Sequence, residues 1–128
     1  MRPITPATVR PPFANYSHGM EVPAGHRLLF ASGQLGIAPD DRVPDDAGEQ
    51  ADLCFQAIGA ILAGAGMGFA DIVRINAFVT DRAHLRPYME TRDRYVAAPP
   101  PASTLMIVAG FARPEFKVEV EVIAAKGE

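Results

Sequence analysis

The sequence is poor in lysine and in long apolar runs, and each shortage excludes a class of function. Of the 128 residues only Lys117 and Lys126 are lysines, and the net charge is −3. Binding to nucleic-acid phosphates needs clustered Lys and Arg, so we expect no nucleic-acid partner. No apolar run approaches the roughly 20 residues of a membrane span, and the N-terminal residues lack the apolar core of a signal peptide. The sequence therefore predicts a cytoplasmic protein with no membrane contact.

Cysteine and histidine are also scarce. Cys54 is the single cysteine, so an internal disulfide is excluded, and His18, His26 and His84 lack the spacing of metal ligands. Cys54 falls on the apolar stripe of a predicted helix, where we expect an inert core thiol. The length suits one domain over residues 1–128, with a single core.

Proline and glycine are clustered along the chain and leave two long segments clear enough for helices. Two short β-candidate runs, about Tyr16–Val22 and Arg27–Ser32, are joined by Pro23-Ala24-Gly25-His26, a pattern that predicts a hairpin. Apolar periodicity predicts a helix from about Gly48 to Ala65. The β-branched run Ile72–Thr80 predicts a strand that lies parallel to an earlier one, because a helical crossover precedes it. The remaining predicted elements are a helix over Leu85–Val96 and strands over Thr104–Val108 and Lys117–Ala124.

The last predicted strand has two chemically different faces. Side chains alternate along a strand, so Val118, Val120 and Val122 share one face, and Glu119 and Glu121 share the other. We expect the valines to pack under the two helices of an α+β sandwich built on a mixed sheet. A homo-oligomer is the simplest cover for the acidic face.

Several short motifs follow one another along the chain in a fixed order. They are Asn15-Tyr16-Ser17, Ser32-Gly33-Gln34-Leu35-Gly36, Glu49-Gln50, Phe69-Ala70-Asp71-Ile72-Val73, Val79-Thr80-Asp81, Pro101-Ala102 and the Glu119 strand. Together they resemble the motifs of the Rid family, also called the YjgF family, of reactive-intermediate deaminases, and the resemblance runs from about Pro12 to Ala125. It implies a chorismate-mutase-like fold, with two helices on one face of the sheet, a homotrimer whose sheets form a central barrel, and ligand clefts between subunits.

The resemblance also implies a chemistry. Active members hydrolyse enamines and imines to a carbonyl product and ammonia without a metal or cofactor. In the family, a glutamate of the final strand holds the attacking water, and an arginine after the Pro-Ala pair grips the substrate carboxylate. Glu119 matches the glutamate and is the expected catalytic residue, whereas Ser103 stands at the arginine position. A serine offers one donor and no charge, so an atypical substrate anchor is expected.

The second predicted helix departs from the family pattern as well. Met89 and Arg92 occupy positions where the family often has an asparagine and a tyrosine, and Leu105 replaces a small or sulfur-bearing residue. Arg92 or Arg113 is a candidate substitute for the missing anion clamp. The expected substrate-binding residues are Tyr16, Gly33, Ser103, Leu105, Met89 and Arg92.

Each of these residues has a purely structural alternative. Glu119 can be a solvated strand acid or an acceptor at a subunit interface, and Tyr16 a packing aromatic with a satisfied hydroxyl. Gly33 can serve backbone geometry alone. Ser103 can bond the backbone at a strand end, and Arg92 can be a helix-surface or interface arginine.

The expected partner is a small molecule, and the sequence is compatible with two functions toward it. The first is hydrolysis of an enamine or imine in an inter-subunit cleft. The second is binding of a small metabolite in the same cleft without catalysis. RNA cleavage or inhibition of translation, which has also been attached to this family, is the weakest of the three because the chain is acidic and has no basic stripe.

Overall fold

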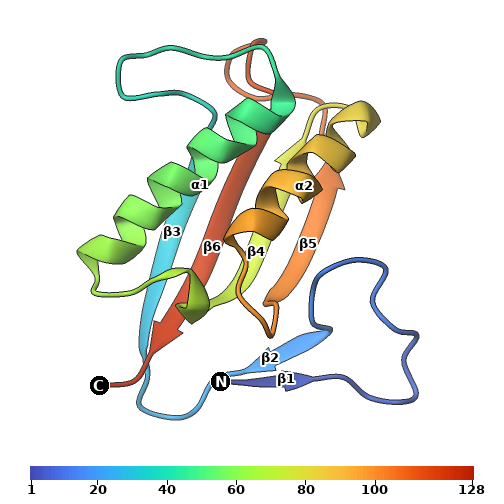
Figure 1. Ribbon diagram of the computed structural model, residues 1–128, viewed down its shortest axis with the longest axis vertical. Coiled ribbons are helices and arrows are strands. Elements are labelled where there is room, and N and C mark those ends of the chain that lie inside the picture. Colours follow the sequence, from blue (N-terminus) through green and yellow to red (C-terminus); the bar gives the residue numbers. More distant parts are fainter.

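Four long strands form one sheet, and two helices cover one of its faces (Figure 1). The computed structural model describes residues 1–128. The helices α1 (Ala47–Gly64) and α2 (Leu85–Tyr95) lie side by side on that face. This mixed architecture confirms the predicted fold class. The strands are β3 (Arg27–Leu35), β4 (Ile72–Val79), β5 (Ala102–Ile107) and β6 (Val118–Lys126), in the order β3-β6-β4-β5.

The last strand of the chain lies inside the sheet. β6 pairs antiparallel with both β3 and β4, and β5 pairs parallel with β4. β4 therefore runs in the same direction as β3, as predicted from the crossover, but β6 separates the two strands. The crossover through α1 leaves the width of one strand between them, and β6 fills that gap with valines that are at most 2% exposed.

The predicted hairpin of residues 16–22 with residues 27–32 is wrong. Its turn exists, with Gly25 at φ +82°, but β2 (Gly19–Glu21) pairs with β1 (Arg2–Ile4) in a separate two-stranded sheet. β3 pairs instead with β6. Turn residues specify a reversal of the chain and not the partner of the next strand, and β3 gains a longer ladder with β6 than three-residue β2 offers.

Helix α1 forms where the sequence predicts it. The Asp46 carboxylate caps its start by accepting a hydrogen bond from the Glu49 N–H at 2.9 Å. Its end is marked by Gly66, whose φ of +70° lies in the left-handed region. Its buried stripe packs on the sheet and consists of Ala47, Gln50, Ala51, Cys54, Phe55, Ile58 and Leu62.

Helix α2 is shorter and is joined to α1 by polar contacts. It follows the 3₁₀ turn Arg82–His84, and a second 3₁₀ turn, Phe69–Asp71, precedes β4. The Thr91 hydroxyl donates to the Gly48 carbonyl at 3.3 Å, and the Tyr95 hydroxyl donates to Asp52 Oδ1 at 2.5 Å. These bonds hold the helices together over the sheet.

The two faces of the sheet differ as the last strand predicts. Val118, Val120 and Val122 belong to the core under the helices, and Glu119 and Glu121 lie on the opposite, open face. That open face also carries exposed apolar side chains of the edge strand β3, with Leu28 at 55% and Phe30 at 68% exposure. The chain has no helix with the length and apolarity needed to cross a membrane.

Candidate functional site

The carboxylate of Glu119 is seated against the backbone of Gly33. A methyl group added at Gly33 would lie 2.7 Å from Cδ and 2.8 Å from Oε1 of Glu119. Residue 33 falls within an irregularity of the β3–β6 ladder between Ala31 and Gln34, which turns the backbone toward this side chain. Gly33 therefore leaves the space that the Glu119 carboxylate occupies.

Glu119 has apolar neighbours on both sides. Its cross-strand partners are Leu35 on β3 and Phe78 on β4. Partial burial is the larger cause that raises the pKa of Glu119 above its ordinary value, and the negative charge of Glu121 on the same face raises the pKa further. A carboxyl group with a raised pKa binds a proton more readily than an ordinary carboxylate, which suits it to accept and return a proton.

A chain of hydrogen bonds crosses the open face next to Glu119. The Asn76 amide nitrogen donates to Glu121 Oε1 at 3.3 Å, and Arg74 Nε donates to Asn76 Oδ1 at 2.9 Å. Arg74 Nη2 donates to the hydroxyl of Thr104 at 2.6 Å. Beside this chain lies a hollow of about 340 Å³, lined by Phe30, Ala31, Ser32, Asn76, Glu121, Val122 and Ile123. The open face thus carries a polar network that reaches from β5 to β6.

Tyr16 lies near the start of β5. The next residue, Ser17, forms a bridge with Ala102, and its N–H donates to the Pro101 carbonyl at 3.0 Å. The Tyr16 hydroxyl accepts a hydrogen bond from the Phe13 N–H at 3.2 Å, and its ring meets the edge of His18. Tyr16 and Ser103 therefore belong to the same edge of the sheet.

Ser103 and Leu105 lie on the helix-covered side of β5. Ser103 is in register with Ile75 and Leu105 with Ala77, and both partners are fully buried. Leu105 and Met89 of α2 are partly buried and pack against the hydrophobic core. This side of β5 is consequently apolar apart from the Ser103 hydroxyl.

Arg92 is buried and not on the surface of α2. It is 3% exposed, so the helix-surface alternative is wrong. Its Nε and Nη2 both donate to Asp93 Oδ1, at 3.1 and 3.0 Å, and its guanidinium lies 5.8 Å from the ring centre of Tyr88. Asn15 donates to the same Asp93 oxygen, so this ion pair also fastens the N-terminal segment. Arg113 is paired with Glu115 at 2.5 Å.

Within one chain the expected site residues form two separate groups. Glu119 is in register with Phe78, which is in register with Met106, three residues along β5 from Ser103. With strands about 4.8 Å apart and about 3.3 Å per residue, the Cα atoms of Glu119 and Ser103 are roughly 14 Å apart. They also point to opposite faces. The structure brings Gly33 to Glu119, and it places Tyr16, Ser103, Leu105, Met89 and Arg92 near the other edge.

The sequence reasoning missed Arg74 and Asn76. Both lie on β4, where the buried residues Ile75, Ala77 and Val79 alternate with them. The same alternation was available in the sequence, and it places Arg74 and Asn76 on the face opposite the apolar one. What the sequence lacked was the pairing of β4 with β6, which sets Asn76 directly opposite Glu121.

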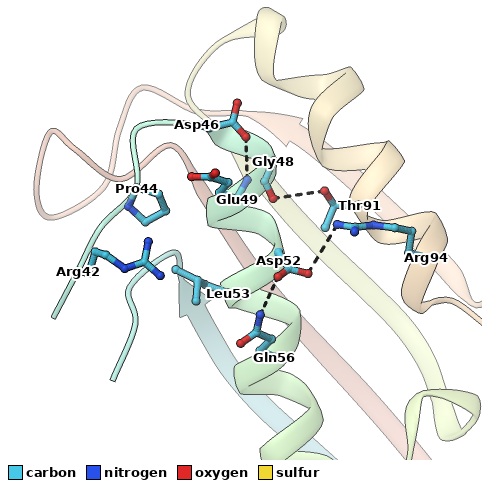
Figure 2. Close-up of a pocket in the computed structure, with 10 residues that line it drawn as sticks. All are labelled: Arg42, Pro44, Asp46, Gly48, Glu49, Asp52, Leu53, Gln56, Thr91 and Arg94. Atoms are coloured by element: carbon cyan, nitrogen blue, oxygen red, sulfur yellow. Dashed lines mark hydrogen bonds and ion pairs between the residues drawn. The ribbon is translucent and has the colours of Figure 1, made fainter. Parts of the chain in front are cut away.

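The largest hollow of the chain lies elsewhere, at the helix-covered side (Figure 2). It has a volume of about 490 Å³ between the 36–46 loop, the first half of α1 and the end of α2. Its central acid is already occupied: Asp52 accepts from Gln56 at 2.6 Å and from Tyr95, and pairs with Arg94 at 3.6 Å. These contacts explain the polar hollow as part of the junction between the helices.

Comparisons with known proteins agree on one family. Residues 7–126 match the family model described as endoribonuclease L-PSP. The chain is 33% identical over 111 residues to Protein DfrA of Myxococcus xanthus, covering 85% of this chain and 83% of that protein. It is 30% identical over 124 residues to the 2-iminobutanoate/2-iminopropanoate deaminase of Mus musculus, covering 95% and 86%. The crystal structure of YyfB from Yersinia pestis, described as a Rid family protein, superposes with a TM-score of 0.85 at 28% identity and covers 98% of each chain.

Proposed function

We propose that this chain, which belongs to the Rid (RidA/YjgF) family, hydrolyses a small enamine or imine to a carbonyl compound and ammonia. The observation that carries the proposal is the Glu119 carboxylate, seated on Gly33, flanked by apolar side chains and raised in pKa. Such a group can hold a water molecule and take its proton. The mouse relative named as an iminobutanoate and iminopropanoate deaminase supports this class of reaction.

The proposed reaction needs one group that carries a proton. Ionised Glu119 accepts a proton from water as the water oxygen bonds to the carbon of the protonated imine. The same carboxyl group then returns this proton to the nitrogen of the resulting carbinolamine. The carbon–nitrogen bond breaks, ammonia leaves, and the hydroxyl group of the carbinolamine becomes the carbonyl group with loss of its proton to the departing ammonia. One protonated imine and one water thus give one carbonyl compound and one ammonium ion.

The proposed cleft needs two copies of the chain. Gly33 belongs to the edge strand β3, and Ser103 and Tyr16 belong to the opposite edge at β5. The two groups are too far apart within one chain to contact one small substrate. A homotrimer in which β3 of one copy approaches β5 of the next would bring them together, and would also cover the exposed Leu28 and Phe30. Light scattering at micromolar concentration should therefore give three times the chain mass; a monomer would exclude this cleft.

The proposed substrate is anchored without a strong carboxylate clamp. Ser103 offers one hydroxyl, and the Arg92 guanidinium is buried against Asp93. Leu105 and Met89 add apolar surface on the same side of β5. These surroundings suit an imine with an apolar substituent better than an imine of a small amino acid.

Metabolite binding without catalysis is the second candidate function. The arginines beside β5 are engaged by other side chains, which favours this function, because a weakly anchored imine would leave before water attacks. RNA cleavage, suggested by the description of the family model, is disfavoured by the paired acids Glu119 and Glu121 on the open face, which repel phosphates.

An imine-trapping assay tests the proposal. Imines are generated in situ by an amine oxidase or an amino-acid oxidase and captured by semicarbazide, so that a hydrolase lowers the yield of semicarbazone. Wild type should lower that yield, and Glu119→Gln, matched in size, should not. Equal yields with wild type, Glu119→Gln and no protein, across both imine classes, would reject hydrolysis. Equilibrium binding of the corresponding carbonyl compounds by the same sample would then support the binding function.

A further inference from the structure

We propose that Glu121, held in place by Asn76 and Arg74, acts as a positioning residue that sets the protonation state of Glu119. The inference rests on the proposed function of Glu119. It implies that the charge of Glu121 helps to determine the pH range over which Glu119 is ionised and active. None of the three residues needs to touch the substrate.

The backbone places Glu121 close to Glu119. The two side chains are two residues apart on one strand and point to the same open face, so their Cα atoms are about 6.5 to 7 Å apart. Asn76 lies directly opposite Glu121 on β4 and donates to its Oε1 at 3.3 Å. This bond restrains the Glu121 carboxylate on the face that it shares with Glu119.

Arg74 determines which way the Asn76 amide faces. Because Arg74 Nε donates to Asn76 Oδ1 at 2.9 Å, the amide oxygen is occupied and the NH₂ group is directed to Glu121. The second bond of Arg74, to Thr104 at 2.6 Å, draws its guanidinium toward β5. Arg74 forms no ion pair with Glu121 or Glu119, since Asn76 stands between them.

The other elements around Glu119 contribute no charge that would cancel this effect. β3 presents Gly33 and Leu35, and β4 presents Phe78 as the direct partner of Glu119. From the helix side only the thiol of Cys54 is coupled to Glu119, and burial raises the pKa of that thiol to about 12, so it stays neutral. Glu121 is the one charged group that contributes to the raised pKa of Glu119, and the ammonium group of Lys117, two residues before Glu119, is engaged by the Asp45 carbonyl.

The arrangement has a measurable consequence. The negative charge of Glu121, on a side chain whose Cα atom is about 6.5 to 7 Å from that of Glu119, disfavours ionisation of Glu119 and raises its pKa. Burial of Glu119 adds to this in the same direction. A neutral, equally large side chain at position 121 removes only the contribution of the like charge.

Carbon-13 NMR titration of the Glu119 carboxyl group measures this effect without any turnover. We expect Glu121→Gln to lower the titration midpoint of Glu119 by about 0.5 to 1.5 pH units. The conservative variant Glu121→Asp keeps the negative charge, so its Glu119 midpoint should stay close to that of wild type. Asn76→Ser, which keeps both acids but releases Glu121, should lower the midpoint part of the way. Arg74→Gln, which removes the cation and keeps a donor for Asn76, should change it by less than about 0.3 units.

The outcomes separate this inference from the proposed function. In a hydrolase, the acid limb of the pH–rate profile should shift with the Glu119 midpoint in each variant. A shifted midpoint in a protein that hydrolyses no imine would reject the catalytic proposal and keep the tuning of Glu119 by Glu121. An unchanged midpoint in folded Glu121→Gln and in folded Asn76→Ser would overturn the inference, whatever the activity.

Discussion

Replacing Gly33 by alanine tests the Glu119 site most directly, because one methyl group enters the space of the carboxylate. The new carbon would lie 2.7 Å from Cδ and 3.0 Å from Cγ of Glu119, well inside ordinary contact distance. The tip of the Glu119 side chain must move by about 0.7 Å or more to relieve the overlap. Misplacement of a catalytic group by about 1 Å can cost on the order of 100-fold in rate, so we expect a loss of about 10- to 100-fold in kcat/KM.

Stability should change little in this variant. Positive φ values among the glycines occur at Gly25 and Gly66, so alanine at position 33 imposes no left-handed strain. Alanine also reduces the freedom of the unfolded chain, which stabilises by about 0.4 to 1 kcal/mol. That gain offsets the displacement of one flexible side chain. We expect the free energy of unfolding to stay within about 1 kcal/mol of wild type, a few degrees in melting temperature.

Two other glycines supply controls for the same substitution. At Gly36 a methyl group would lie 2.4 Å from Cβ and 2.8 Å from Cα of Gln50, atoms that cannot move without α1. Gln50 is fully buried and donates to the carbonyls of Pro44 and Glu115, so Gly36→Ala should destabilise by more than about 3 kcal/mol. At Gly64, near the end of α1, nothing lies within 4 Å, so Gly64→Ala should leave activity unchanged and raise stability slightly.

The imine-trapping assay and a thermal melt distinguish the possibilities. Full activity in a folded Gly33→Ala protein would refute the reasoning, because it would mean that the position of the Glu119 carboxylate does not matter. Loss of both folding and activity would assign Gly33 to the structure of β3 instead of the site.

Three further predictions concern charge and burial. Ser103→Arg introduces a charged donor pair for a substrate carboxylate, worth about 2 to 4 kcal/mol in a partly desolvated cleft, and should raise the hydrolysis of carboxylate-bearing imines at least about tenfold. A folded, trimeric variant without this gain would show that position 103 cannot hold a substrate carboxylate. Because the pKa of Glu119 is raised in the folded chain, wild type loses stability as pH rises from 4.5 through that raised value. Melting scans should therefore show the stability of Glu119→Gln rising relative to wild type over this pH range, and a stability difference that does not change with pH below it. Cys54 is fully buried with a pKa raised to about 12, so a thiol reagent at pH 8 should modify the native chain only at its unfolding rate, and rapid labelling would contradict the core assignment.

The local elements were determined by the sequence itself. Asp46 and the apolar stripe through Cys54 and Leu62 specify the start and the buried face of α1. The alternation of valine and glutamate specifies the two faces of β6, and the motifs around Gly33 and Glu119 identify the family. Each of these signals depends on residues that are near neighbours in the chain, where the periods of helices and strands control which side chains share a face.

Strand partners were decided only by the tertiary structure. The turn at Gly25 predicts a reversal of the chain, yet β2 pairs with β1 and β3 pairs with β6. The partner of a strand depends on which distant strand can form the longer run of paired residues and bury the apolar face of the sheet. The contact of Glu119 with Gly33 results from the pairing of β6 with β3, and the position of Asn76 opposite Glu121 results from the pairing of β6 with β4. The burial of Arg92 follows from the packing of α2. Contacts between residues 40 to 90 positions apart leave no periodic trace in a single sequence, so the sequence could name candidates such as Glu119 and Gly33 but not the contacts that Asn76 and Arg74 make beside them.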